Sequence, residues 1–159
     1  MAEFSRYDIY VLLNQPKPLW LSHIDLSGMD LRGVQLNGAT LIGSNLRDVD
    51  LRGASLIDTN LGGANLHGAK LVGADLRRAN LRGTDMHGAN LREANLAEAD
   101  LSDADLSEAN LIDSNLGAAD LTNANLTGAD LSGTNATDHR LNRAKSLSGT
   151  VFPDGSKHE

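Results

Sequence analysis

The sequence contains no cysteine, which excludes disulfide bonds, cysteine-ligated zinc and a thiol nucleophile. Aromatic residues are scarce: two Phe, two Tyr and one Trp among 159 residues. The apolar run near the start, residues 9–13, is too short to cross a bilayer, and it lacks the basic flank and small-residue cleavage site of a secretory signal. We therefore expect a cytoplasmic chain that does not associate with membranes.

Positive charge is missing from a long part of the sequence. Residues 93–138 carry ten acidic residues and no Lys or Arg, whereas residues 27–92 carry eight Lys and Arg against six Asp. The formal net charge is -7, and the few arginines lack an aromatic stacking partner. Both observations disfavour direct binding to nucleic acid. Negative charge is therefore concentrated in residues 93–138, whereas residues 27–92 carry a small excess of positive charge.

One five-residue phrase dominates the rest of the sequence. From Leu21 to Leu141, every fifth residue is leucine at 23 of 25 positions, with Met86 and Ala136 as the exceptions. A period of five fits neither the 3.6-residue helix turn nor the alternation of a long strand. It predicts a solenoid of short extended segments joined by turns, in which each coil pairs with the next. The leucine and the residue two before it should both point inward, because residues two apart share one side of an extended segment.

The phrase reads small residue, Asp or Asn, Leu, and two variable positions, as in Ala-Asn-Leu-His-Gly at 64–68 and Ala-Asp-Leu-Ser-Gly at 129–133. In this pattern the chain resembles the pentapeptide-repeat family, in particular its compact, uninterrupted members that are abundant in cyanobacteria. The resemblance implies an all-β solenoid: a right-handed quadrilateral β-helix with four repeats per coil. The 25 repeats would make a little over six coils and a rod of about 30 Å.

Three parts of the chain are expected. Residues 1–18 should form an N-terminal cap, a short helix followed by a proline-rich turn, because Phe4, Tyr7 and Val11 recur at helical spacing. We expect Trp20 to pack beneath this helix. Residues 19–154 should form the β-helix, and residues 155–159 a tail.

The repeat becomes irregular near its C-terminal end. The 25 in-register repeats reach residue 143, after which a register shift of one residue makes Leu147 and Phe152 the next two centres. Ala136 lacks most of a leucine's volume, and His139 stands where the other repeats have a smaller residue. The hypothesis that follows is that the imidazole of His139 fills part of the gap at Ala136.

The outward residues of the acidic stretch form the candidate interaction surface. They are Glu93, Glu98, Asp100, Asp103, Asp105, Glu108, Asp113 and Asp120. At the C-terminal end, Val151 and Phe152 are a possible contact between two copies. The sequence indicates no catalytic residue, no cofactor and no metal: it has no nucleophile elbow or phosphate loop, and His67 and His87, one coil apart, lack a third ligand.

Two functions remain open at this stage. The first is a non-catalytic, rigid protein-interaction scaffold of unknown biochemical role, with an unidentified protein partner, as a monomer or a homodimer paired at the C-terminal end. The second, implied by resemblance to gyrase-protecting members of the family, is a DNA mimic that binds DNA gyrase or another DNA-binding protein through the acidic half. Leucine rather than phenylalanine at the centres disfavours the second function. In the alternative interpretation, the acidic residues only keep the surface solvated and bind no partner.

Overall fold

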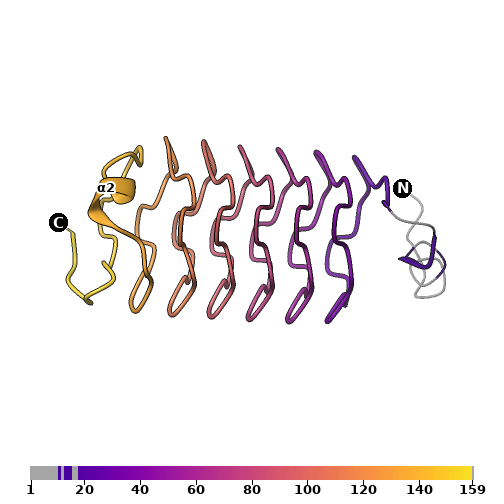
Figure 1. The fold of residues 1–159 in the computed structure, drawn as a ribbon, viewed down its shortest axis with the longest axis horizontal. Helices are drawn as coiled ribbons and strands as arrows, with labels where there is room; N and C mark the ends of the chain where they lie inside the picture. Colours follow the sequence, from indigo (N-terminus) through magenta and orange to yellow (C-terminus); the bar gives the residue numbers. More distant parts are fainter. Residues whose placement is uncertain (1–10, 12, 16–17, 159) are drawn as a thin grey trace.

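The chain winds into stacked coils of 20 residues. The computed structural model describes residues 11, 13–15 and 18–158. Parallel bridges join Asp25 to Asn45, Asn45 to Asn65, and so on along the rod, always 20 residues apart up to Asn110 and Asp130. Each coil therefore holds four five-residue repeats, and the coils stack along one axis (Figure 1). The molecule is a parallel β-solenoid in which isolated bridges, rather than long strands, connect the coils.

A tight turn in every repeat explains the period of five. The Ala69 N–H donates to the Leu66 carbonyl at 2.9 Å, and Gly68 between them has a φ of +64°. A positive φ at the third residue of a turn is most easily adopted by glycine. The Leu66 N–H donates in turn to the Asp85 carbonyl of the next coil at 2.6 Å. Each repeat thus makes one corner of the coil and one set of bonds to its neighbour.

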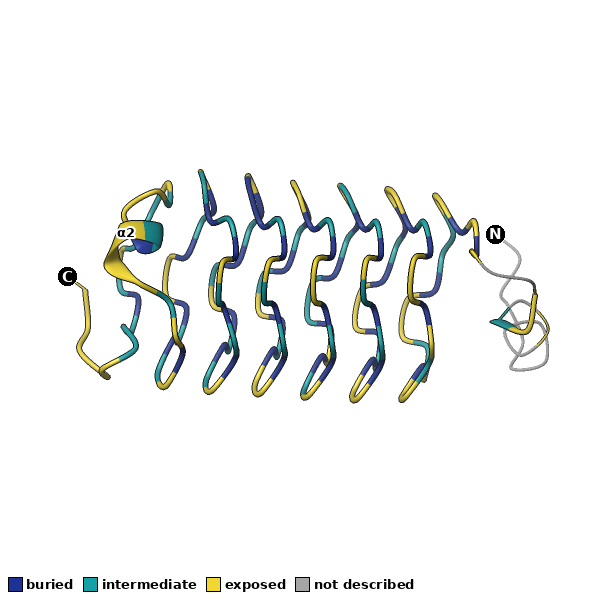
Figure 2. Ribbon diagram, in the orientation of Figure 1, coloured by how far each residue is buried: buried dark blue, intermediate teal, exposed yellow. Residues whose placement is uncertain are grey.

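The leucines form a continuous dry core, as the sequence predicts. From Leu36 to Leu131, every residue at the centre position, Met86 included, is at most 1% exposed. The small residue two positions earlier is buried as well along most of the rod, as at Ala64 and Ala89. Figure 2 shows this pattern as buried segments that alternate with exposed corners along every coil. The inward prediction for both positions is confirmed.

Hydroxyl groups in the small-residue positions have two different environments. The Ser44 hydroxyl donates to the Leu41 carbonyl at 2.7 Å, and the Thr84 hydroxyl donates to the Leu81 carbonyl in the same way. The buried hydroxyls of Ser114 and Thr134, which occupy equivalent positions one coil apart, have no hydrogen-bond partner among the described residues. These two hydroxyls are therefore buried without a hydrogen bond that would offset their loss of contact with water, near the C-terminal end of the regular coils.

Helix α2, Asp138–Leu141, interrupts the coils near the C-terminus (Figure 1). The prediction of in-register repeats up to residue 143 is wrong here, because Ala136 provides no leucine to anchor a coil segment. Before α2, the Asn135 side chain donates to Asn115, 20 residues earlier; after it, Ser146 pairs with Asn125, 21 residues earlier. The spacing between paired residues thus increases by one residue within the segment that contains α2.

The compensation hypothesis for His139 is also wrong. His139 is exposed, and Leu141 is the buried residue of α2. A single helical turn directs these two side chains to different sides. Leu141, only 2% exposed, contributes apolar volume to this end of the core.

The last coil ends in a segment that folds back on the chain rather than in a free tail. Val151 pairs with Asp130 in parallel and with Lys157 in antiparallel orientation. The His158 N–H donates to the Thr150 carbonyl at 2.8 Å. The prediction of a tail at residues 155–159 is therefore incorrect for the described part, because this segment pairs with a backbone edge that would otherwise be open.

The predicted N-terminal cap lies mostly outside the described residues, Phe4 and Tyr7 included. Val11 and Leu13 are helical, and Leu13 packs against the core. Trp20, however, is 78% exposed, so the prediction that it packs beneath the helix is wrong. It directly precedes the inward Leu21 and therefore points outward. No helix in the described chain has the length and apolarity needed to span a membrane.

Candidate functional site

The eight acidic residues of the candidate surface occupy two kinds of position. Five are exposed third residues of the corner turns, with φ between +57° and +62°: Glu93, Glu98, Asp103, Glu108 and Asp113. We call these five residues the acidic belt. The other three directly precede a core leucine and are partly buried: Asp100, Asp105 and Asp120.

The three partly buried aspartates stabilise the turns. Asp120 Oδ1 accepts hydrogen bonds from the Thr122 N–H at 3.0 Å and from its hydroxyl at 2.5 Å. These bonds, the side-chain one above all, hold the pKa of the Asp120 carboxyl below its usual value. Asp100 and Asp105 accept the same pair of bonds from serines two residues later. Their carboxylates are thus engaged locally, which makes them poor contacts for a partner.

The acidic belt surrounds the rod instead of forming one face. A coil has four corners, and Glu93, Glu98, Asp103 and Glu108 are the third residues of four successive turns. Asp113 follows one coil after Glu93. The structure therefore does not bring the predicted residues together on a single flat surface, and a partner that contacts one side meets only part of the belt.

Basic side chains of the preceding coil or of the same turn lie beside part of the belt. Arg82 Nη2 lies 3.0 Å from an Asp103 carboxylate oxygen, and Arg92 Nε lies 3.2 Å from a Glu93 oxygen. His87 Nε2 is 3.8 Å from Glu108. Within the described residues, Glu98 and Asp113 form no ion pair at 4 Å or less.

The arginines of the N-terminal coils are already paired. Asp75 binds Arg77 through three hydrogen bonds of 2.7 to 3.1 Å between side chains, and these contacts hold the pKa of the Asp75 carboxyl below its usual value. Arg78 binds Asp58 of the preceding coil at 2.8 Å. Every arginine between residues 27 and 92 forms such an ion pair. Sequence reasoning did not identify these pairs, although the Asp-Leu-Arg spacing at 75–77 places both charged side chains on the same outward side.

The two histidines of the central coils lie side by side. The rings of His67 and His87 stack with centroids 5.1 Å apart, and His87 Nδ1 lies 2.9 Å from the Ser107 hydroxyl. No group of three or more His, Cys, Asp or Glu residues able to hold a metal ion occurs in the described part of the chain. The stack is a side-chain contact between neighbouring coils.

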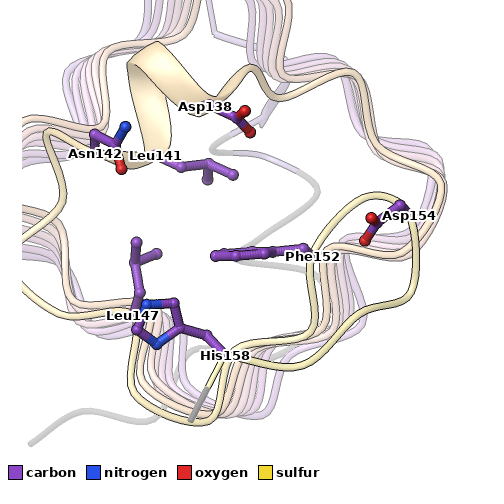
Figure 3. A pocket seen from close by; sticks show the side chains of 7 residues that line it. All are labelled: Asp138, Leu141, Asn142, Leu147, Phe152, Asp154 and His158. Atoms are coloured by element: carbon purple, nitrogen blue, oxygen red, sulfur yellow. The ribbon is translucent and has the colours of Figure 1, made fainter.

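A pocket opens at the C-terminal end of the rod (Figure 3). Its volume is about 420 Å³. The lining residues are Asp138, Leu141, Asn142, Leu147, Phe152, Asp154 and His158. Of the two residues expected to contact another copy, Phe152 lines this pocket, and Val151 pairs with Asp130 and Lys157 beside it. The other six lining residues come from α2 itself or from the chain that follows it, which sequence periodicity does not bring together.

Comparison with known sequences identifies the repeat along most of the chain. The family described as pentapeptide repeats matches in eight copies, over residues 21–58, 44–83, 59–97 and 99–135. No curated protein matches the chain. The matched residues span the coils from the first leucine centre to the segment just before α2.

Solved structures show the same architecture. HetL from the cyanobacterium Nostoc sp. strain PCC 7120, a pentapeptide repeat protein involved in heterocyst differentiation regulation, is 33% identical with a TM-score of 0.52. The alignment covers 89% of this chain and 78% of HetL. QnrB1, a plasmid-mediated fluoroquinolone resistance protein, is 21% identical with a TM-score of 0.56, over 86% of this chain and 79% of QnrB1. At that identity, QnrB1 is informative about the fold alone.

Proposed function

This chain belongs to the pentapeptide-repeat family, and on that premise we propose that it is a rigid, non-catalytic scaffold that binds a basic protein partner through the acidic belt. The right-handed, four-sided form of the β-helix is carried over from the family as part of this proposal. One observation supports the proposal above the others: acidic residues occupy five consecutive corners at positive φ.

Acidic residues at those corners make the fold less stable than glycine would. Among the fourteen corners from His23 to Gly88, ten carry glycine. None of the seven corners from Glu93 to Asn123 carries glycine, and five of these seven are acidic. A left-handed conformation costs most L-residues roughly 1–2 kcal/mol and aspartate less, so glycine would relieve strain above all at the glutamate corners Glu93, Glu98 and Glu108. Such a concentration of strained acidic residues is typical of a surface kept for contact with another molecule.

The coil supplies the rigidity that a scaffold needs. Each belt residue donates its backbone N–H to a carbonyl of the next coil, as from Glu98 to Gly117 at 2.8 Å and from Asp113 to Ser132 at 2.9 Å. The carboxylates therefore project from corners whose backbone is fixed on both sides. A backbone that is already fixed adds no ordering cost of its own when a complementary surface binds.

Affinity capture from the source cell followed by purified binding measurements tests this proposal. The belt variant is Glu98→Gln with Asp113→Asn, which keeps side-chain size but removes the two charges that have no ion pair. The control is Asp48→Asn with Asp58→Asn, two corner acids that form ion pairs with Arg47 and Arg78.

We expect one basic partner whose affinity falls at least tenfold in the belt variant, falls with rising salt, and is unchanged in the control. Equal affinities of wild type and belt variant for every captured protein would refute the role of the belt. Absence of any protein retained by the wild type would refute the scaffold.

The DNA-mimic alternative receives less support from the charge distribution. The belt extends over little more than one coil, about 5 Å along the axis, and the coils before it carry paired arginines. A DNA duplex presents negative charge continuously along its length. We expect no inhibition of gyrase supercoiling at micromolar concentrations of the protein, and inhibition would favour the mimic. The cytoplasmic location stays a prediction.

A further inference from the structure

The C-terminal end of the rod has apolar side chains that remain accessible. At the C-terminal end, Leu147 and Phe152 are only partly buried and border the pocket of about 420 Å³. A volume of this size lies in the range of natural ligand pockets. The C-terminal end therefore offers a pocket of ligand size.

The pocket has an apolar interior. In Figure 3 the side chains of Leu141, Leu147 and Phe152 extend from the surrounding segments toward the centre of the hollow. The Phe152 ring is held by the His158 ring, whose centroid lies 5.5 Å away at an interplanar angle of 70°. Leucine side chains and one fixed aromatic ring suit the methylene groups of an extended side chain.

Two carboxylates lie on one side of the hollow. Asp138, in the first turn of α2, and Asp154, in the turn after Phe152, are both exposed and lie on the same side in Figure 3. Asp154 Oδ1 accepts hydrogen bonds from the Ser156 N–H and hydroxyl, at 2.9 and 2.6 Å, so the residue is fixed in place. The Ser156 side-chain bond also holds the pKa of the Asp154 carboxyl below its usual value. No lysine or arginine is among the described residues that line the pocket.

We propose that this pocket binds a lysine or arginine side chain of a partner protein, with the aliphatic stem against Leu141 and Leu147 and the cationic head between Asp138 and Asp154. The ring of Phe152, seen edge-on in Figure 3, turns one face toward the side where Leu141 and Asp138 lie. A cation over that face gains a cation–π contact in addition to the two carboxylates. The inference rests on the proposed scaffold function and adds a second contact, at the end of the rod, for a basic partner.

Charge and area favour this occupant over a second copy of the chain. Four of the seven lining residues are polar or charged, and one of the three apolar ones, Leu141, is already 2% exposed. A stable dimer buries about 1,200–2,000 Å² with an apolar centre, which a pocket lined by so few accessible apolar atoms does not supply. A single inserted side chain fits both the volume and the acidic rim.

The scarcity of phenylalanine provides a direct measurement. The chain has only two Phe residues, so labelling with fluorophenylalanine gives two fluorine resonances, and the one that disappears in Phe152→Leu reports on the pocket. The probes are blocked Gly-Gly-X-Gly-Gly peptides in which X is arginine, lysine, norleucine or glutamate. Norleucine retains the stem of lysine without its charge.

We expect saturable shifts of the Phe152 resonance with the arginine and lysine peptides, and at least tenfold weaker binding of the norleucine and glutamate peptides. Asp138→Asn with Asp154→Asn should weaken arginine binding at least tenfold, since asparagine retains the acceptor oxygen for Ser156 but not the charge. Phe152→Leu, followed by calorimetry, should weaken it about threefold. A cooperative thermal transition of the double variant confirms that it is folded.

Three results would overturn the inference: no saturable shift with arginine or lysine up to 10 mM, norleucine binding as tightly as lysine, or a Phe152 resonance that changes with protein concentration alone because a second copy fills the pocket. The belt variant Glu98→Gln with Asp113→Asn separates this inference from the scaffold proposal. The full partner should lose affinity in both variants, whereas the arginine peptide should lose affinity only in the pocket variant. Loss of partner binding in the belt variant alone would refute the pocket and retain the scaffold.

Discussion

Replacing Ala118 by glycine should stabilise the protein, the opposite of what glycine usually does. Ala118 is an exposed corner residue with a φ of +58°, and its side chain is a single methyl group without charge or hydrogen bond. The left-handed conformation costs alanine at least about 1 kcal/mol relative to glycine. Glycine loses about 0.4–1 kcal/mol through the greater entropy of its unfolded chain. The net effect is a stabilisation of about 0.5 kcal/mol.

The matched control is Ala97→Gly. Ala97 belongs to the same region and lies in the second position of its turn, where φ is not positive. It has no strain to relieve, so glycine there should destabilise by about 0.5–1 kcal/mol. Urea denaturation and calorimetry of both variants provide the test, with an expected rise of about 1–2 °C for Ala118→Gly and a fall of about 1–4 °C for Ala97→Gly. A lower melting temperature in both variants would refute the strain argument, and with it the main support for the acidic belt as a binding surface.

Three further predictions concern the core and the turns. Leu76→Asp should abolish folding, seen as loss of the cooperative thermal transition, because it places an unpaired charge in a column that is 0% exposed; a variant that melts at the wild-type temperature would contradict the inward packing. Ser114→Ala should leave stability unchanged or raise it, since its hydroxyl has no partner, whereas Ser44→Ala should lower it by about 1 kcal/mol because a 2.7 Å hydrogen bond is lost. The melting temperature should be constant above about pH 5 and fall below about pH 4. The pKa of the Asp120 carboxyl is lower in the folded chain than in the unfolded one, so the stability that its charged form contributes is lost when it is protonated. Asp120→Asn should reduce this fall.

The coil and its core were predictable because one rule applies at every repeat. Leucine at every fifth position, with a small residue two places earlier, leaves only one arrangement that buries both. The exceptions have physical reasons that periodicity does not contain. Helix α2 is four residues long, too short to form through intrinsic propensity, and it exists only because the adjacent coil and Leu141 hold it. The sequence marks the break at Ala136 but not the structure that fills it.

The candidate surface was predictable as a set of outward acids but not in its division into two kinds. Asp120 and Glu98 are both outward, yet one accepts hydrogen bonds within its turn and the other occupies a strained corner. Local signals for this division exist: a Ser or Thr two residues after the aspartate, as at Thr122, indicates the engaged kind. The pocket had no such signal, because Asp138, Phe152 and His158 meet only through the return of the chain after α2.

In a coil with four corners, the position of a residue along the rod axis determines the direction in which it faces around that axis. One repeat of five residues turns the chain by a quarter of a revolution, and four repeats advance it by one spacing of about 4.8 Å. Deleting a single repeat, for example residues 64–68, would therefore rotate the belt and the end pocket by about 90° relative to the first coils while shortening the rod by only about 1 Å. Deleting 20 residues would shorten it by one full spacing without any rotation. The number of repeats thus sets the mutual orientation of two contact points almost independently of their separation, and a partner that touches both can distinguish repeat numbers that differ by one.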